Sequence, residues 1–174
     1  MPRNRIIVPD TIVIHYSATP VEKDFSVGDI DAMHRQRGFN KIGYHFYITK
    51  DGTVHKGRDT VERGVEMGAH VKGHNDHTIG ICYEGGVTLA QPHTGRDTRT
   101  LEQTAAMVDL IKQLQRQYHI KMIVGHRDLG STQCPGFDVK SWWASVTAPP
   151  AAQPELTLVE RIIQWLTSIL SRGR

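Results

Sequence analysis

The sequence predicts an α/β protein in which a single mixed central β-sheet is flanked by helices, with a further amphipathic helix at the C-terminus. Short β-branched runs alternate with longer segments of helical periodicity, which is typical of an α/β domain. Asp51-Gly52 joins two of the strand-like segments and is a β-hairpin signal. The 174 residues are enough for one domain with a hydrophobic core and an appendage.

The first two elements are a strand and a helix. Residues 11–16 (TIVIHY) are rich in β-branched side chains, so we expect a buried strand with His15 near its end. Residues 17–20 (SATP) follow as a turn. A helix is expected over 24–37, because four residues recur at helical spacing before Gly38: Val27, Ile30, Met33 and His34.

The next two strands form the predicted hairpin. Residues 42–48 (IGYHFYI) alternate, and Asp51-Gly52 connects them to residues 53–55 (TVH), with glycine supplying the positive φ of the turn. Successive side chains of a strand point to opposite faces, which predicts two sets: Tyr44 with Phe46, and His45 with Tyr47.

Three more elements complete the expected body. Residues 78–83 (TIGICY) indicate another strand, as do residues 121–126 (KMIVGH), which again end in a histidine. Between them, apolar residues repeat every three or four positions over 101–118, which predicts the longest helix. Thr100 and Gln103 have the spacing of a capping box at its start.

Composition places the chain among ordinary globular proteins, with 39% hydrophobic and 22% charged residues. The net charge is +3 and the cations are scattered, so we expect no nucleic-acid partner. The two cysteines, Cys82 and Cys134, argue against a disulfide scaffold, and Cys82 is expected in the core. The apolar stretch near the N-terminus spans only residues 6–8, short of the ~7–15 of a signal peptide, so we expect synthesis in the cytoplasm without one.

Two of the ten histidines stand out by their position. His15 and His126 both end apolar strands, and strands of one sheet can bring their ends together; Cys134 follows eight residues after His126. Two imidazoles and one thiolate form a three-ligand zinc set that leaves a fourth position for water. Because no compact signature such as H-E-x-x-H is present, ordinary histidines and a structural zinc site are alternatives at this point.

Six segments occur in order along about residues 10–145: IVIHYSAT, GYHFYITKDGTVHKGRD, MGAHVKGHN, TIGICYEGG, GHRDL and QCPGFDVKSWW. Together they resemble the zinc-dependent N-acetylmuramoyl-L-alanine amidases related to phage T7 lysozyme and the peptidoglycan recognition proteins, the amidase type 2 family. The resemblance implies that family's fold and a Zn2+ cofactor. It also implies hydrolysis of the amide bond between N-acetylmuramic acid and L-alanine in bacterial peptidoglycan.

The resemblance implies roles for individual residues. The histidines of IHYSAT and GHRDL and the cysteine of CPGFD match the family's zinc ligands, which here are His15, His126 and Cys134. Tyr44, in GYHF, matches the catalytic tyrosine whose hydroxyl hydrogen-bonds the zinc-bound water. The ligand set is the same one that strand position suggested.

One position departs from the T7-like branch. Two residues before the cysteine ligand those enzymes carry a lysine, whereas this sequence has Thr132, as many catalytic peptidoglycan recognition proteins do. Zinc and a neutral hydroxyl are then left to stabilise the oxyanion. His70 and Asn75, in AHVKGHN, resemble residues that line the substrate groove. We expect His45 in the core and six other histidines exposed: His34, His55, His74, His77, His93 and His119.

The composition changes at residues 147–154 (TAPPAAQP), a Pro/Ala-rich linker that cannot continue a helix. We therefore expect a zinc amidase catalytic domain over 1–146, the linker over 147–154 and an amphipathic helix over 155–174. Two hypotheses remain open for this helix. Either it packs on its own domain or a second copy, or residues 155–172 bind a bacterial membrane surface.

The expected setting is a phage or prophage endolysin in host cell lysis, with peptidoglycan as its partner. Such an enzyme is made in the host cytoplasm and reaches the wall, in the periplasm, once the inner membrane is permeabilised. The alternatives are a non-catalytic peptidoglycan-binding module and a muropeptide-recycling amidase. Cys134 disfavours both, because binding-only members lack the cysteine ligand and the recycling branch typically has aspartate there.

Overall fold

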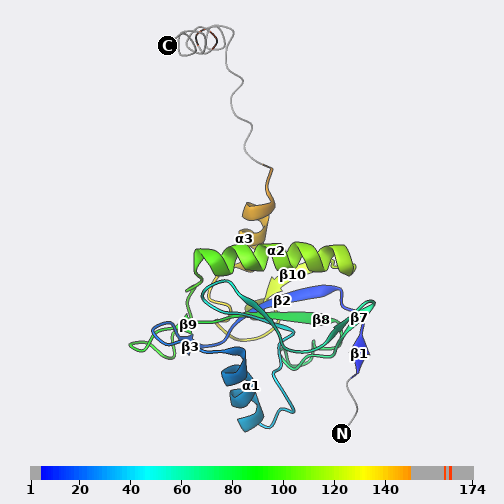
Figure 1. Ribbon diagram of the computed structural model, residues 1–174, viewed down its shortest axis with the longest axis vertical. Coiled ribbons are helices and arrows are strands. Elements are labelled where there is room, and N and C mark those ends of the chain that lie inside the picture. The colour runs from blue at the N-terminus through cyan, green and yellow to red at the C-terminus, as the bar shows by residue number, and fades with distance from the viewer. Residues whose placement is uncertain (1–4, 150–162, 164, 166–174) are drawn as a thin grey trace, which may run out of the picture.

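The computed structural model describes residues 5–149 together with residues 163 and 165. Figure 1 shows the arrangement of its elements. The helices are α1 (Val27–Gln36), α2 (Leu101–Gln117), α3 (Val139–Thr147) and the 3₁₀ turn η1 (His126–Asp128). The strands are β1 (Ile6–Ile7), β2 (Thr11–Tyr16), β3 (Thr19–Pro20), β4 (Phe46–Ile48), β5 (Val54–Lys56), β6 (Thr60–Val61), β7 (Gly64–Glu66), β8 (Thr78–Tyr83), β9 (Gly86–Val87) and β10 (Met122–Gly125).

The central sheet has five strands in the order β10-β2-β8-β4-β5. The first four pair in parallel, and β5 pairs antiparallel with β4. The predicted mixed α/β fold is therefore confirmed. β2 and β8 coincide with the expected strands 11–16 and 78–83 at both ends. Nearly all their residues are buried, which explains why both sequences are predominantly apolar instead of alternating.

Helices cover both faces of this sheet, with α2 and α3 on one face and α1 on the other (Figure 1). Ile12 and Ile14 of β2 belong to the core cluster that contains Met107 and Ile111 of α2. Because side chains alternate along a strand, His15 points to the opposite face, the one toward α1. The sheet thus places this histidine away from the main core and on the side of α1.

Both predicted helices of the body are present. α2 begins at Leu101 with the expected capping box, in which the Thr100 hydroxyl accepts from the Gln103 N–H and the Gln103 side chain accepts from the Thr100 N–H. α1 starts three residues later than expected, because Ser26 and Asp29 form a capping box of their own. Residues 24–26 therefore precede that helix.

The strand expected over 42–48 is shorter, and its predicted faces are wrong. Regular pairing begins only at Phe46, and residues 42–45 lie in bends and irregular backbone. There the Arg58 N–H donates to the Tyr44 carbonyl at 2.9 Å, and the Ala69 N–H donates to Gly43 at 3.0 Å. These bonds interrupt the regular alternation of a strand. Tyr44 therefore packs in the same hydrophobic cluster as Tyr47, whereas Phe46 belongs to the main core cluster. His45 is fully buried, as expected.

Three features were not predicted. A three-stranded sheet, β1-β7-β6, and a two-stranded one, β3-β9, flank the central sheet. Most of their strands are two residues long, too short to show alternation. α3 is capped by Asp138, whose carboxylate accepts from the Ser141 N–H at 2.7 Å, and its Trp142 packs against the ring of Phe137.

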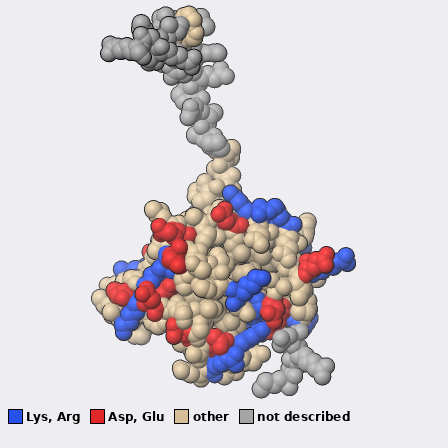
Figure 2. Space-filling model, viewed as in Figure 1, with Lys and Arg blue, Asp and Glu red and all other residues tan. Residues whose placement is uncertain are grey.

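The body reaches the start of the expected linker, since α3 ends at Thr147 and Ala148 caps it. The rest of the linker and nearly all of the expected C-terminal helix lie outside the described residues; Ile163 and Trp165 are helical and more than half exposed. Within the described part, the helices are too short or too polar to cross a bilayer. Figure 2 shows that cationic and anionic side chains intermingle on the face in view.

Candidate metal centre and groove

Two neighbouring parallel strands bring His15 and His126 together. β10 pairs with β2 so that Gly125 lies opposite Ile14. His126, the next residue after β10, therefore reaches the same sheet edge as His15, the next residue after Ile14. Their ring centroids are 4.7 Å apart. Register alone thus explains how residues distant in sequence become adjacent.

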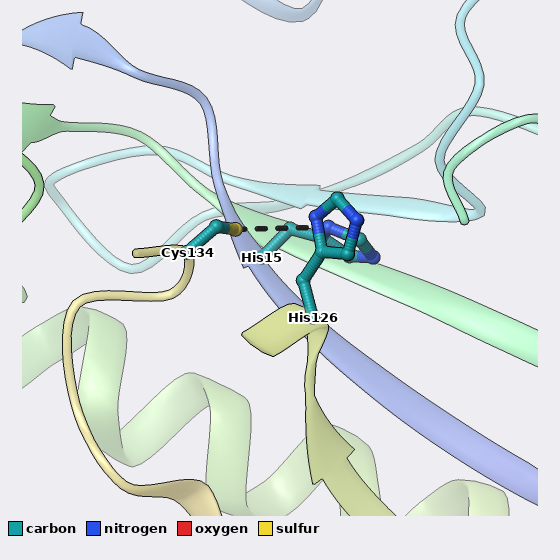
Figure 3. A group of neighbouring side chains, drawn as sticks. All are labelled: His15, His126 and Cys134. Atoms are coloured by element: carbon teal, nitrogen blue, oxygen red, sulfur yellow. Dashed lines mark hydrogen bonds between the residues drawn. The ribbon is translucent and has the colours of Figure 1, made fainter. Parts of the chain in front are cut away.

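A loop after η1 returns Cys134 to this edge (Figure 3). The Arg127 N–H donates to the Cys134 carbonyl at 2.7 Å, and the Tyr16 N–H points at its sulfur at 3.3 Å. Gly125 leaves room for the loop, because a Cβ there would lie 2.8 Å from Cδ of Pro135. The Cys134 sulfur lies 3.8 Å from Nδ1 of His15.

The donor atoms of His15, His126 and Cys134 all lie within 4.8 Å of one another, and the group fits a metal ion. Burial lowers the pKa of both histidines, which keeps the imidazoles in the neutral form that binds metals. Burial also raises the pKa of the Cys134 thiol to about 12. A thiolate at this position therefore needs an adjacent cation, and two nitrogens with one sulfur suit zinc.

The three residues line an open groove of about 630 Å³. Its walls come from the turn after β2, from α1 and the residues following it, and from the loop before β8. The residues that line it besides the metal group include Tyr44, His70, Asn75 and Thr132. The structure therefore places all seven residues singled out from the sequence around one cavity.

Tyr44 is half-buried, with its ring centroid 5.2 Å from that of His15. Burial raises the pKa of its phenol well above the usual value, so the hydroxyl is neutral and can both donate and accept. Thr132 lies on the loop that carries Cys134. Its hydroxyl oxygen accepts from the Cys134 N–H at 3.2 Å, which leaves the hydroxyl hydrogen available to a ligand.

His70 and Asn75 line the groove from the loop before β8. The Asn75 side-chain oxygen accepts from the N–H groups of His70 and Val71, both at 2.9 Å, and so braces this loop. The His70 ring faces the metal group directly, with Nδ1 lying 3.0 Å from Nε2 of His15. His70 thus contacts a metal-group residue as well as the groove.

His34, which was expected to be exposed, is buried and lines the groove. Its Nδ1 accepts from the Gly43 N–H at 2.9 Å, and its ring lies 5.2 Å from those of Phe39 and Tyr44. Its helical spacing from Ile30, four residues before, was the available signal. Of the other five histidines expected to be exposed, His93 and His119 are exposed. The remaining three are half-buried: His55, His74 and His77.

Arg37 and Lys72 also line the groove, and both are exposed. The guanidinium of Arg37 lies 5.7 Å from the centre of the Phe39 ring. No sequence motif marked either cation, because an exposed lysine or arginine in a loop is common on any surface.

Comparisons with known proteins place the chain in a family. The family described as N-acetylmuramoyl-L-alanine amidase matches residues 4–137. The chain is 36% identical over 132 residues to an endolysin of Klebsiella phage KP32, which covers 76% of this chain and 83% of that protein. It is 34% identical over 134 residues to an endolysin of Escherichia phage T7, covering 77% and 85%.

Solved structures of other proteins are also similar to this chain. The endolysin N-acetylmuramoyl-L-alanine amidase LysCS from Clostridium intestinale is similar with a TM-score of 0.67 at 30% identity, over 83% of this chain and 90% of that one. The Drosophila peptidoglycan recognition protein LB is similar with a TM-score of 0.61 at 26% identity, over 82% and 85%.

Proposed function

The chain belongs to the N-acetylmuramoyl-L-alanine amidase family, and from this membership we propose that it uses zinc, held by His15, His126 and Cys134, to act as a phage endolysin. It is a peptidoglycan amidase: it hydrolyses the bond between N-acetylmuramic acid and L-alanine, as its endolysin and amidase relatives indicate.

The observation that carries the zinc proposal is a three-donor group in the wall of an open groove. Structural zinc sites are normally closed by four protein ligands, whereas catalytic sites keep one position open. Among the described residues, the group that can hold a metal has three members. The open groove next to them gives a substrate access to the remaining position.

When bound, zinc would act as a Lewis acid that lowers the pKa of water to about 7 and polarises a carbonyl oxygen. We assign to Tyr44, beside the metal site, the role of orienting the attacking water through its neutral phenol. Thr132 donates its hydroxyl hydrogen to the oxyanion that develops on the lactyl carbonyl. The leaving amine of L-alanine takes up a proton relayed from the attacking water.

The groove walls bind the peptidoglycan stem in this proposal. His70 and Asn75 form one wall, and Arg37 and Lys72 place two cations along the groove. Peptide stems carry free carboxylates, which arginine and lysine bind through charge-assisted hydrogen bonds. The substrate would therefore lie with its peptide along the side that carries these cations.

Digestion of purified sacculi followed by mass spectrometry tests the reaction. We expect intact stem peptides with free N-terminal L-alanine, no cut glycan chains, loss of activity with a chelator and recovery with zinc. The variant His126→Ala should lose both metal and activity. Activity of this variant without bound metal would contradict the metal assignment, and cut glycan chains would contradict the amidase assignment.

The remaining expectations from the sequence stay proposals. We propose that residues 1–146 form the catalytic domain, that 147–154 tether a C-terminal helix over 155–174, and that the enzyme meets the wall after the inner membrane is permeabilised. Residues 155–172 are proposed to bind the membrane surface. Deletion of 149–174 should then abolish binding to anionic liposomes while hydrolysis of purified sacculi is retained; unchanged liposome binding would contradict the membrane role.

A further inference from the structure

A series of hydrogen bonds runs from His15 through the groove-lining His70 into the protein. Nε2 of His15 lies 3.0 Å from Nδ1 of His70. On the other side of that ring, Nε2 of His70 lies 3.3 Å from the hydroxyl oxygen of Thr78. The Thr78 hydroxyl in turn donates to the backbone carbonyl of His74 at 2.7 Å. Three side chains and one carbonyl thus form a single line.

The carbonyl at the end of this line fixes its direction. A carbonyl oxygen only accepts, so the single hydroxyl hydrogen of Thr78 points to His74 and the Thr78 oxygen accepts from Nε2–H of His70. A neutral imidazole has one N–H, so Nδ1 of His70 is an acceptor. Nε2 of His15 is therefore its donor, and Nδ1 of His15 keeps a free lone pair.

We infer that His70 is a positioning residue which, with Thr78, holds His15 in the tautomer that presents Nδ1 to the metal. Nδ1 is the nitrogen that faces the Cys134 sulfur at 3.8 Å. This inference rests on the proposed metal site and adds to it. The backbone carbonyl of His74, outside the groove, selects the His15 tautomer whose Nδ1 can bind the metal. Metal-binding histidines depend on such partners for both tautomer and ring orientation.

The His70 ring has little freedom to turn away. Two glycines border it: a Cβ at Gly80 would lie 2.6 Å from its Cγ, and a Cβ at Gly68 would lie 2.5 Å from its Cδ2. The ring of His45 packs edge-on against it, with centroids 5.6 Å apart. Asn75 holds the His70 backbone at 2.9 Å. The two glycines thus leave a slot that the imidazole occupies.

The opposite direction of these hydrogen bonds fits the surroundings less well. It would place the hydrogen of His15 on Nδ1, pointing at the Cys134 sulfur, and would need the Thr78 hydroxyl to donate to His70. The carbonyl of His74 would then lose the Thr78 hydrogen. Thr78 is fully buried, so water does not replace that bond from its side.

A matched set of variants in the full chain tests this role by zinc affinity, measured by competition with a chromophoric chelator. In His70→Asn the amide oxygen takes the place of Nδ1 and still accepts from His15, whereas His70→Gln keeps only the contact with Thr78. We expect His70→Asn within about threefold of wild type and His70→Gln and His70→Ala weaker by about 10–100-fold. Equal affinity in all variants, or equal loss in all three, would overturn the inference.

The tautomers themselves can be observed in the wild-type chain without metal. Long-range 1H–15N correlation spectra of the zinc-free protein should show His15 and His70 both protonated at Nε2. A hydrogen on Nδ1 of His15 would overturn the inference even if every His70 variant failed to fold. If wild type binds no zinc, the proposed metal site fails, while these spectra still decide the tautomer independently.

Discussion

Replacing Tyr44 by Phe tests the proposed chemistry most directly, because it removes one oxygen and leaves the ring. The ring contacts with His15 and His34, both at 5.2 Å between centroids, are retained. The free energy of unfolding should therefore change by about 1 kcal/mol or less. Loss of one catalytic hydrogen bond raises an activation barrier by about 1.4–4 kcal/mol, which corresponds to a fall in kcat of about tenfold to a thousandfold.

The assay is release of stem peptides from sacculi, with zinc content measured in the same preparation. Tyr47→Phe is the matched control: its hydroxyl donates to the Phe25 carbonyl at 3.0 Å, outside the groove, so activity should stay near wild type. Zinc content of Tyr44→Phe should also stay near wild type. Loss of zinc from this variant, or full activity, would refute the assigned role.

Three further predictions concern stability. Glu66→Gln removes a fully buried carboxylate that pairs with Arg58 at 2.9 Å and should lower the free energy of unfolding by about 3–5 kcal/mol in urea titrations; a loss below 1 kcal/mol would contradict it. Thr100→Ala removes the cap of α2 and should cost about 1–2 kcal/mol in the same assay. Hydrogen bonds from the Thr49 hydroxyl and from the backbone N–H and hydroxyl of Thr53 lower the pKa of Asp51 to about 2. The stability that the Asp51 carboxylate gives to the turn is therefore present above about pH 4 and is lost as the pH falls through 2. An NMR titration midpoint near 3.8 would contradict this.

The sequence was most informative where strands are buried on both faces. Residues 11–16 and 78–83 are predominantly apolar runs, and each is a strand with the predicted ends. The meeting of His15 and His126 also follows from strand position, once β10 lies beside β2. The position of Cys134, eight residues after His126, suggested it as the third ligand, whereas the bonds to Tyr16 and Arg127 that hold its loop in place are not encoded by any periodicity.

The wrong predictions for Tyr44 and His34 share a physical cause. Alternation predicted the face of Tyr44 only on the assumption of a regular strand, and backbone bonds to Ala69 and Arg58 removed that regularity. His34 shares the helical spacing of Ile30 and was nevertheless expected to be exposed. A buried polar side chain needs a partner, and the one that His34 uses, the Gly43 N–H, exists only after that same irregular segment has formed.

The parallel order of β10, β2 and β8 makes assembly of the proposed metal site a late event in folding. β2 is near the start of the chain and β10 near the end of the domain, yet they are adjacent in the sheet. The donors therefore converge only after the intervening residues have closed a long loop, a slow step for parallel pairing. Unfolded chains lack the assembled group, so the proposed zinc would bind the native state preferentially and its concentration would shift the folding equilibrium. Uptake of zinc would thus report completion of the fold.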